Sequence, residues 1–558
     1  LDGDGWGDII LGCPDCGNVL LAAVGSIYLI KGKDRSQLGD IDLFAAATSE
    51  EYCNAAGMSV MYGESANERL GCAISSAGNF NADNRSDIVF ASCGQGFTSL
   101  YIMDSFAFLN WSYSGRSTDF AVGLVGTKMK LLSTTGDVSL SLLGDSNRDG
   151  YSEIIVGFPK HDDNAGVVFV VNGEEFWSLT LHLDSLPSDR ALRFDGGIGD
   201  AECGTAVAGM FKTQFAPLMG ILITCPGAVR RFDPFTSFTF SSATATTISR
   251  VGRTYVIFLG ENATSLGDSA VNLHTFLTSL QTGFTISGSI ESGGLGASVD
   301  VVTKFGAPDE WFIAVGAPNA SNSAAYLISN KDILIDGVDT AAPTTVPSAS
   351  PTSTPTVMPS ANKFPTIDVT ILTNGMVQIN LPTVDSSLGS SGANNGYIVD
   401  INEIYRFGSR VASIGDVNQD GFGDLALGFP NTDHMGRVGA GMVAVVFGTN
   451  ELNGDNIDLE ETMDGFGGFV IYGDIVYGRV GSTVCAAGDV NNDGFPDFAI
   501  AAANATQEAS VNSGIIYVVF GIDTSVQNWV DIDLKMYTWG GFRIYGAGMN
   551  AHSGMSLS

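Results

Sequence analysis

The chain has 558 residues, too many for one ordinary compact core, and its 44% hydrophobic and 15% charged residues are typical of a folded protein. Its formal charge of −34 argues against nucleic acid, whose phosphates require Lys and Arg, and disfavours anionic membrane surfaces. Clustered carboxylates instead favour divalent cations. The longest uncharged apolar stretch, 215–229, is too short to span a bilayer and contains two prolines, so we expect no membrane-spanning segment in this chain.

The first predicted element is an acidic loop, residues 2–8, followed by a short apolar strand, 9–11. A nine-residue version of the loop, with Asp, Asn or Glu at positions 1, 3, 5 and 9, recurs four times, and the N-terminal copy lacks its first position. Each copy again precedes an apolar run: 88–90, 154–156, 425–427 and 498–500. Two degenerate copies, 221–226 and 313–318, keep the strand but have lost the acids, which makes seven units.

Other segments recur in register with the loops. A Gly-Phe segment lies upstream of a loop (468–473 and 541–546), a third strand follows (443–448 and 516–521), and a fourth comes later (457–459 and 532–534). Alternation and β-branched content identify all of these as strands. Four short antiparallel strands in each of seven units predict an all-β fold, a seven-bladed β-propeller with calcium loops.

These segments resemble the FG-GAP repeats of the integrin α-subunit propeller. The Gly-Phe strand, the acidic loop and a Gly-Phe-Pro or Gly-Ala-Pro ending (157–159, 428–430 and 316–318) carry the resemblance, which covers nearly the whole chain apart from one linker. The resemblance implies that partners bind the face opposite the calcium loops.

The two ends of the chain are complementary. Residues 541–558 contain a first strand and stop where the next acidic loop should begin, whereas the N-terminus begins inside an acidic loop without a first strand. The ends therefore meet in one blade if the ring closes within this chain. The alternative is a cut from a longer array, with parts of two tandem propellers.

A linker at 342–366 is rich in Pro, Thr and Ser, so we expect it to be extended and solvated. It separates blades one to five, residues 1–341, from blades six and seven with the closing strand, residues 367–558. It is either an insertion on the outer rim or a boundary between two propellers.

Calcium takes six to eight oxygens, which the loops offer from side chains at positions 1, 3, 5 and 9 and from the backbone carbonyl at position 7. Position 6 is Gly or Asn, as a sharp left-handed turn requires. A single copy could equally be an Asx-rich turn that caps a hairpin, but five copies in register favour up to five structural Ca²⁺ ions. The predicted ligand residues are Asp2, Asp4, Trp6 and Asp8; Asn79, Asn81, Asp83, Arg85 and Asp87; Asp145, Asn147, Asp149, Tyr151 and Glu153; Asp416, Asn418, Asp420, Phe422 and Asp424; and Asp489, Asn491, Asp493, Phe495 and Asp497. The loop at Asn79 has only two carboxylates, so we expect it to bind most weakly.

Two cysteine pairs flank loops symmetrically, so the strands of one hairpin should bring each pair face to face as a disulfide. These pairs are Cys72 with Cys93 and Cys203 with Cys225. A third close pair, Cys13 and Cys16, could be a redox or zinc motif, although a local disulfide is favoured. Cys53 and Cys485 have no evident partner.

Four glycosylation acceptor patterns begin at Asn110, Asn262, Asn319 and Asn504. Together with the even number of cysteines, eight, they predict an extracellular or cell-surface location.

The sequence contains few patterns typical of an enzyme active site. The five histidines are scattered, and the sequence has neither a Gly-x-Ser-x-Gly elbow nor a His-Glu-x-x-His helix. We therefore expect a non-enzymatic adhesion, protein-interaction or structural module of a surface assembly or filament, which binds other extracellular proteins, copies of itself or glycans. The alternatives are a carbohydrate-binding or carbohydrate-active propeller of lyase or hydrolase type, or a lipid-cleaving enzyme, since calcium propellers resembling this one also occur in lyases and beside phospholipase domains.

Overall fold

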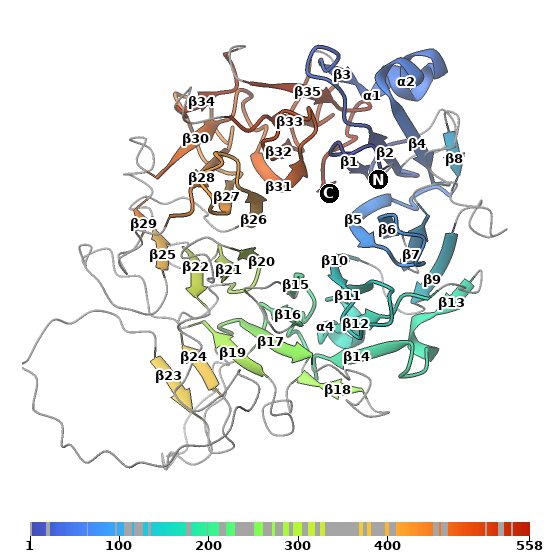
Figure 1. The fold of residues 1–558 in the computed structure, drawn as a ribbon, viewed down its shortest axis with the longest axis vertical. Helices are drawn as coiled ribbons and strands as arrows, with labels where there is room; N and C mark the ends of the chain where they lie inside the picture. The colour runs from blue at the N-terminus through green and yellow to red at the C-terminus, as the bar shows by residue number, and fades with distance from the viewer. Residues whose placement is uncertain are drawn as a thin grey trace, which may run out of the picture.

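Seven β-sheets stand as blades around a central axis in the computed structural model (Figure 1). The structure describes residues 3–17, 23–63, 65–94, 98–104, 114–116, 126–131, 136–174, 180–197, 199–210, 219–228, 250–259, 270–273, 283–288, 294–303, 311–318, 324–329, 368–371, 377–380, 397–400, 409–449, 457–458, 467–507, 510–522, 529–536 and 540–558. We number the blades one to seven in chain order, starting with the blade that contains β1. No helix in these ranges is long and apolar enough to cross a membrane.

The two innermost strands of each blade flank the acidic loop or its degenerate counterpart. In the order of blades one to seven, the inner strands are β36 (Ser556–Leu557), β5 (Leu70–Gly78), β10 (Ser139–Gly144), β15 (Val207–Met210), β20 (Ser298–Thr303), β26 (Arg410–Gly415) and β31 (Val480–Gly488). The second strands are β1 (Ile9–Cys13), β6 (Asp87–Ser92), β11 (Glu153–Phe158), β16 (Met219–Cys225), β21 (Trp311–Ala317), β27 (Asp424–Phe429) and β32 (Asp497–Ala502). Both degenerate copies thus form second strands, as the sequence predicts.

Two further antiparallel strands complete each blade. The third strands are β2 (Ser26–Ile30), β7 (Thr98–Met103), β12 (Val167–Val171), β17 (Arg253–Leu259), β22 (Ala324–Ser329), β28 (Met442–Val446) and β33 (Ile515–Val519). The outer strands are β4 (Met58–Tyr62), β9 (Gly126–Leu131), β14 (Ala191–Asp195), β19 (Gly283–Ser287), β25 (Tyr397–Asp400), β30 (Gly468–Tyr472) and β35 (Gly541–Tyr545). The prediction of four-stranded antiparallel blades is confirmed.

A short fifth strand pairs in parallel with each outer strand, and the next blade supplies it. In blade order these edge strands are β8 (Ser114–Arg116), β13 (Thr180–His182), β18 (Val271–Asn272), β24 (Val377–Asn380), β29 (Ile457–Asp458), β34 (Ile532–Asp533) and β3 (Ile41–Asp42), with β23 (Asp368–Ile371) pairing beyond β24. The assignment of 457–459 and 532–534 as fourth strands of their own units is therefore wrong, because they cross to the preceding blade. The Gly-Phe segments are outer strands of the preceding blade, not first strands.

The ring closes where the two ends of the chain pair in blade one. Leu557 of β36 lies opposite Leu11 of β1, and Ser558 and Ile10 exchange backbone hydrogen bonds of 2.9 and 3.0 Å. The predicted meeting of the ends is confirmed, and parts of two tandem propellers are excluded. The closing strand is β36 rather than the 541–546 segment.

The predicted linker falls inside blade five. The third strand before it, β22, pairs with the outer strand after it, β25, through Ala325 and Val399. Residues 330–367 lie outside the described part of the chain, so the linker boundaries and the 1–341 and 367–558 division stay predictions.

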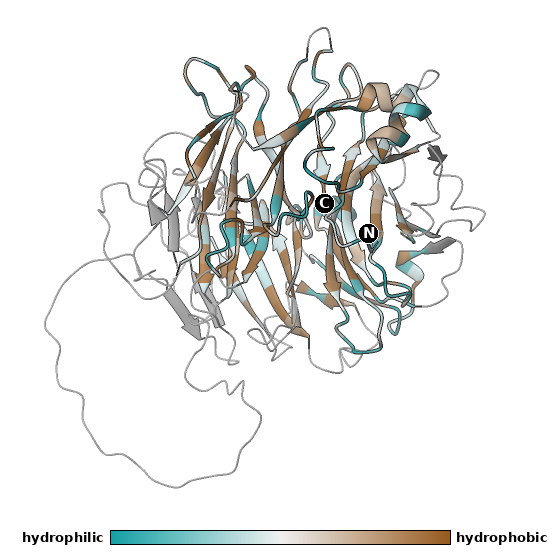
Figure 2. Ribbon diagram, turned by 45° about the horizontal axis from the view of Figure 1, so that its top comes forward, coloured by the Kyte–Doolittle hydropathy of each residue, from teal (hydrophilic) through white to brown (hydrophobic). Residues whose placement is uncertain are grey.

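The core lies between neighbouring blades, because each blade buries both of its faces. Every residue of β27 and β28 is buried, and one apolar cluster joins Ile9 and Tyr28 of blade one to Ala499 and Ile516 of blade seven. Figure 2 shows hydrophobic residues concentrated along the strands. Such two-sided burial suits the short runs of Val, Ile and Ala in these strands.

Short helices decorate the β-structure. Helices α1 (Leu43–Thr48) and α2 (Glu50–Ala56) link β3 to β4, with Asp42 and Ser49 as N-caps and Gly57 ending α2 in a left-handed conformation. A turn, α4 (His161–Asn164), joins β11 to β12, and a 3-10 turn spans Leu183–Ser185.

Disulfides join all three cysteine pairs named from the sequence. Cys72 lies in the inner strand β5 and Cys203 lies just before the inner strand β15. Their partners, Cys93 and Cys225, lie at the ends of the second strands β6 and β16, and Cys13–Cys16 closes a turn at the end of β1. Cys53 is a buried free thiol, and Cys485 is a half-buried one.

Candidate calcium loops

The acidic loops fold around their own side chains. In the blade-seven loop, the Asp489 carboxylate accepts hydrogen bonds from the backbone N–H groups of Asp493, at 3.0 Å, and Gly494, at 2.8 Å. Position 3 accepts from the N–H of position 5, and position 5 accepts from that of position 7, at 2.8 and 3.0 Å. The loops at Asp145 and Asp416 repeat this arrangement. These hydrogen bonds hold positions 1, 3 and 5 in one compact loop. Among the described residues, three carboxylates lie within 4.8 Å of one another only in the loops of blades two and three.

Position 9 is buried in four of the five loops, where it begins the second strand. The Asp497 carboxylate accepts from the N–H of Val490 at 2.8 Å and of Gly521 at 2.9 Å. Asp424 accepts in the same way from Val417 and Gly448, at 2.8 and 3.0 Å. Burial raises the pKa of Asp497 to about 7 and the pKa of Asp424 well above its usual range. Position 9 therefore anchors the loop as well as offering oxygens to an ion.

The blade-three loop fits a cation best. Carboxylate oxygens of Asp145, Asp149 and Glu153 lie within 4.8 Å of one another. Glu153 is fully buried, and its Oε2 accepts from the Ser146 N–H, whereas its Oε1 has no hydrogen-bond partner in the described part of the chain. Burial raises the pKa of Glu153 to about 7, and the two neighbouring aspartates add to the effect. A buried acceptor oxygen without a donor is costly, and a divalent cation would relieve that cost.

The blade-two loop has a carboxylate that the loop motif does not contain. Asp104 follows β7 directly, opposite Asp87, and its oxygen lies within 4.8 Å of those of Asp83 and Asp87. The corresponding residues of the other four blades are Lys31, Asn172, Phe447 and Phe520. The prediction that the loop at Asn79 binds calcium most weakly counted two carboxylates, Asp83 and Asp87. In the structure Asp104 adds a third carboxylate to this loop.

The N-terminal loop repeats part of the arrangement. Asp4 accepts from the Trp6 N–H at 2.9 Å, and Asp8 accepts from the Gly32 N–H at 3.1 Å. Asp2 lies outside the described residues.

A glycine precedes each of the other four loops, at a position outside the predicted nine-residue motif. Gly78, Gly144, Gly415 and Gly488 all have positive φ, and a β-bulge shifts the ladder at each of them. Such a bulge turns the inner strand sharply into the loop, which favours glycine.

Replacement of Gly78 by Ala is expected to destabilise the fold by about 1–2 kcal/mol, because its φ is +59° and a Cβ would lie 2.6 Å from Ser152 Oγ. Gly39→Ala is the matched control, since a Cβ there meets nothing within 4 Å. Urea unfolding of both variants checks this, and equal midpoints would contradict it.

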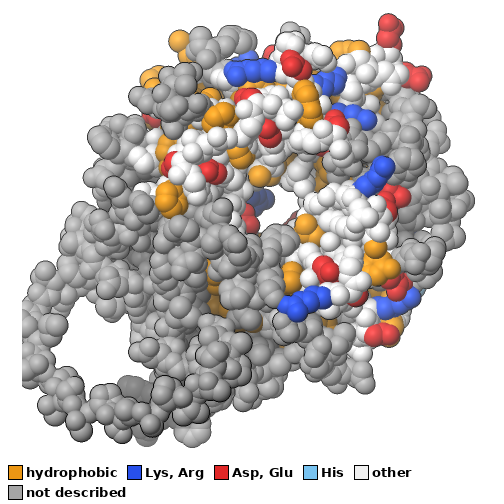
Figure 3. All heavy atoms as spheres, viewed as in Figure 1, with side chains coloured by type: hydrophobic (Ala, Val, Ile, Leu, Met, Phe, Trp, Pro, Cys, Tyr) orange, Lys and Arg blue, Asp and Glu red, His pale blue; other side chains and the backbone are white. Residues whose placement is uncertain are grey.

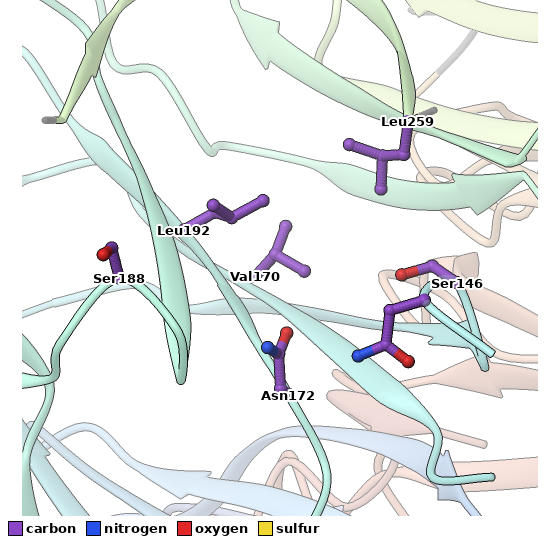
Figure 4. A pocket seen from close by; sticks show the side chains of 7 residues that line it. Ser146, Val170, Asn172, Ser188, Leu192 and Leu259 are labelled. Atoms are coloured by element: carbon purple, nitrogen blue, oxygen red, sulfur yellow. The ribbon is translucent and has the colours of Figure 1, made fainter. Parts of the chain in front are cut away.

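A hollow of about 10 Å³ lies beside the blade-three loop (Figure 4). Its lining residues are Ser146, Asn147, Val170, Asn172, Ser188, Leu192 and Leu259. It has room for about one water molecule, so it is not a substrate site.

The remaining predicted features are the glycosylation sites and the histidines. Asn504 is half-buried after β32, and Asn110, Asn262 and Asn319 lie outside the described residues. Of the histidines, His552 contacts Asp15 at 3.2 Å and the His434 ring stacks on Tyr472. Both contacts have a packing or pairing role.

A family model for the FG-GAP repeat matches residues 407–446 and 480–519, which contain the loops at Asp416 and Asp489. The chain therefore carries FG-GAP repeats on a seven-bladed β-propeller, an arrangement consistent with an integrin α-like FG-GAP propeller.

The chain is also similar to phosphatidylinositol-glycan-specific phospholipase D of several mammals. Identity is 41% over 106 residues with the Bos taurus protein and 37% over 106 residues with that of Homo sapiens, in each case 19% of this chain and 12% of the relative. Identity with the Mus musculus protein is 34% over 139 residues, 24% of this chain and 16% of the relative. The chain thus matches less than a sixth of each relative's length.

Proposed function

We propose that this chain is an extracellular, calcium-stabilised propeller that acts as a protein-interaction module of a cell-surface assembly. The three disulfides suit an oxidising compartment, and the unpartnered Glu153 Oε1 supports the calcium role. The five candidate ions would be structural.

The main support for the interaction role is an apolar arc of exposed side chains. It lies on the face of the ring opposite the acidic loops. Its side chains project from the connections between second and third strands and between successive blades, in blades six and seven. The arc consists of Met435, Val438, Val476, Tyr477, Val511, Met549 and Met555. Met435 is 82% exposed and Tyr477 is 64% exposed.

Hydrogen bonds and an ion pair hold the loops of the apolar arc in place. The Tyr477 N–H donates to the Val438 carbonyl at 2.8 Å. Arg437 forms an ion pair with Asp533, and Asp474 accepts from the Tyr517 hydroxyl. Exposed Met and Tyr side chains are typical of a protein-binding surface, and the same loops also carry the exposed Asp433 and Arg479. Figure 3 shows one face of the ring, on which hydrophobic, acidic and basic side chains of the described residues are interspersed.

Affinity capture from the extracellular fraction of the source cells tests this role. Tyr477→Ser combined with Met549→Ser is expected to lose at least 90% of a captured protein partner, about tenfold in affinity. Val530→Ser is the matched control, because Val530 is 67% exposed on the outer rim. Equal capture by both variants would contradict the proposal.

Carbohydrate binding is the second candidate, and a polar cleft of about 360 Å³ on the same side favours it. Asp162, Asp163, Asp195, Arg193 and Asn272 line the cleft and offer planar hydrogen-bonding groups suited to sugar hydroxyls. A glycan array with the wild type and Asp163→Ala tests it, and no retained glycan would contradict it. The relatives' names leave lipid cleavage as a third possibility, which release of a phosphatidylinositol-glycan anchor would reveal.

A further inference from the structure

Peptide groups connect the acidic loops of blades six and seven. The Val417 N–H donates to the blade-six anchor Asp424 at 2.8 Å, and the Val417 carbonyl accepts from the N–H of Ile522 at 3.2 Å. The residue before Ile522, Gly521, donates its N–H to the blade-seven anchor Asp497 at 2.9 Å. Val417 therefore bonds to the anchor of its own loop through its N–H group, and through its carbonyl to the segment that holds the blade-seven anchor.

The same pattern continues from blade seven to blade one. The Val490 N–H donates to Asp497 at 2.8 Å, and its carbonyl accepts from the N–H of Lys33 at 3.0 Å. The preceding residue, Gly32, donates to Asp8 at 3.1 Å. The position-9 carboxylates of three consecutive loops thus lie on one series of hydrogen-bonded peptides.

Two direct contacts between loops run beside this series. The Gly7 N–H donates to the Asp489 carbonyl at 2.7 Å, so position 8 of the blade-one loop holds position 1 of the blade-seven loop. The Gln419 side-chain amide donates to the Gly494 carbonyl. The loop of blade seven is therefore held from both sides.

We infer that the loops of blades six, seven and one bind their cations cooperatively, with the blade-seven loop as the central member. This inference rests on the calcium role proposed above. An ion in one loop fixes its position-9 carboxylate and the peptides bound to it, and those peptides also shape the neighbouring loop. The neighbouring loop then has less conformational entropy to lose when it binds the second ion, so the second ion binds more tightly. This is positive coupling.

The blade-one loop carries its own optical reporter. Trp6 stands at position 7, so Tb³⁺ bound in this loop is expected to emit when tryptophan is excited, and Trp6→Phe identifies the signal. Asp493→Ala removes an exposed ligand from the blade-seven loop and leaves the Asp497 anchor and its two N–H donors in place.

Terbium titration of the full chain tests the coupling. Asp493→Ala is expected to raise the midpoint of the Trp6 signal about fivefold or more, the lower end of measured couplings. Asp149→Ala is the matched control in blade three, separated from blade seven by blades one and two, and is expected to leave the midpoint unchanged. An unshifted midpoint in Asp493→Ala, or an equal shift in both variants, would overturn the coupling.

Two further measurements keep the outcomes distinct. Failure of the wild type to bind either Tb³⁺ or Ca²⁺ would contradict the calcium proposal itself, whereas binding with an unshifted midpoint contradicts only the coupling. If Asp493→Ala does not fold, as judged by circular dichroism, Gln419→Ala removes just the side-chain contact between blades six and seven. It is then expected to raise the midpoint for the blade-six site, read by calorimetry, and no change would overturn the coupling between those two blades.

Discussion

Removal of calcium by a chelator is expected to lower the thermal unfolding midpoint of this chain by about 10 °C. A site filled at a hundred times its Kd stabilises the folded state by about 2.7 kcal/mol, so five sites give about 13 kcal/mol. A chain of 558 residues has an unfolding entropy of about 1.2 kcal/mol/K, which converts that energy into the stated shift. Without the ions, Asp145, Asp149 and the buried Glu153 also repel one another. Differential scanning calorimetry in calcium and in chelator measures the shift.

A combined variant provides the control for this measurement. Asp149→Ala, Asp420→Ala and Asp493→Ala together remove one exposed carboxylate from each of three loops. The chelator is expected to shift the midpoint of this variant by less than half as much. A thermal unfolding midpoint of the wild type that does not change in chelator would contradict the calcium assignment.

Deletion of residues 549–558 is expected to destabilise the fold by more than about 5 kcal/mol, because blade one then loses its inner strand. Leu557, 8% exposed, packs in the cluster shared by blades one and seven, and Leu→Ala at such a site alone costs about 2–5 kcal/mol. The deletion also leaves the Ile10 N–H and carbonyl without their partners on Ser558. Guanidinium unfolding followed by far-UV circular dichroism measures the loss.

Met555→Ala is the control for the deletion, because Met555 lies in the deleted segment and is 41% exposed. It is expected to change stability by no more than about 0.5 kcal/mol. A deleted chain that unfolds with the wild-type midpoint would show that β36 does not hold the ring closed.

The architecture was predictable because the repeat is visible in the residues. Each acidic loop sits in front of a short apolar run, and those runs became the second strands, such as β27 and β32. The symmetric spacing of cysteines around a hairpin gave the Cys72–Cys93 and Cys203–Cys225 pairs. Local patterns of this kind specify hairpins well, because both partners lie close in sequence.

Non-local pairings were harder to predict. The inner strands β5 and β31 contain Ser, Ala, Cys and Gly, whose weak alternation hides a strand that is packed by its neighbours. The parallel edge strands are only two or three residues long in most blades, and no local pattern indicates which blade they join. Asp104 reaches the blade-two loop only through the register of β6 with β7.

The predicted nine-residue loop motif was one residue too short. A glycine stands immediately before each complete loop, and its regular place indicates a backbone position with positive φ. The loop motif is therefore ten residues long, beginning with that glycine.

Blade one draws its second strand from residues 9–13 and its inner strand from residues 556–557, so its assembly spans nearly the whole chain. During synthesis at about 5–20 residues per second, β1 would wait on the order of half a minute or more for its partner. Contacts at such long sequence separation form slowly, because the loop they close costs entropy before it is repaid in packing. The apolar face of β1 therefore stays exposed until residues 556–557 have been made, and we expect nascent chains of this protein to depend strongly on chaperones for that time.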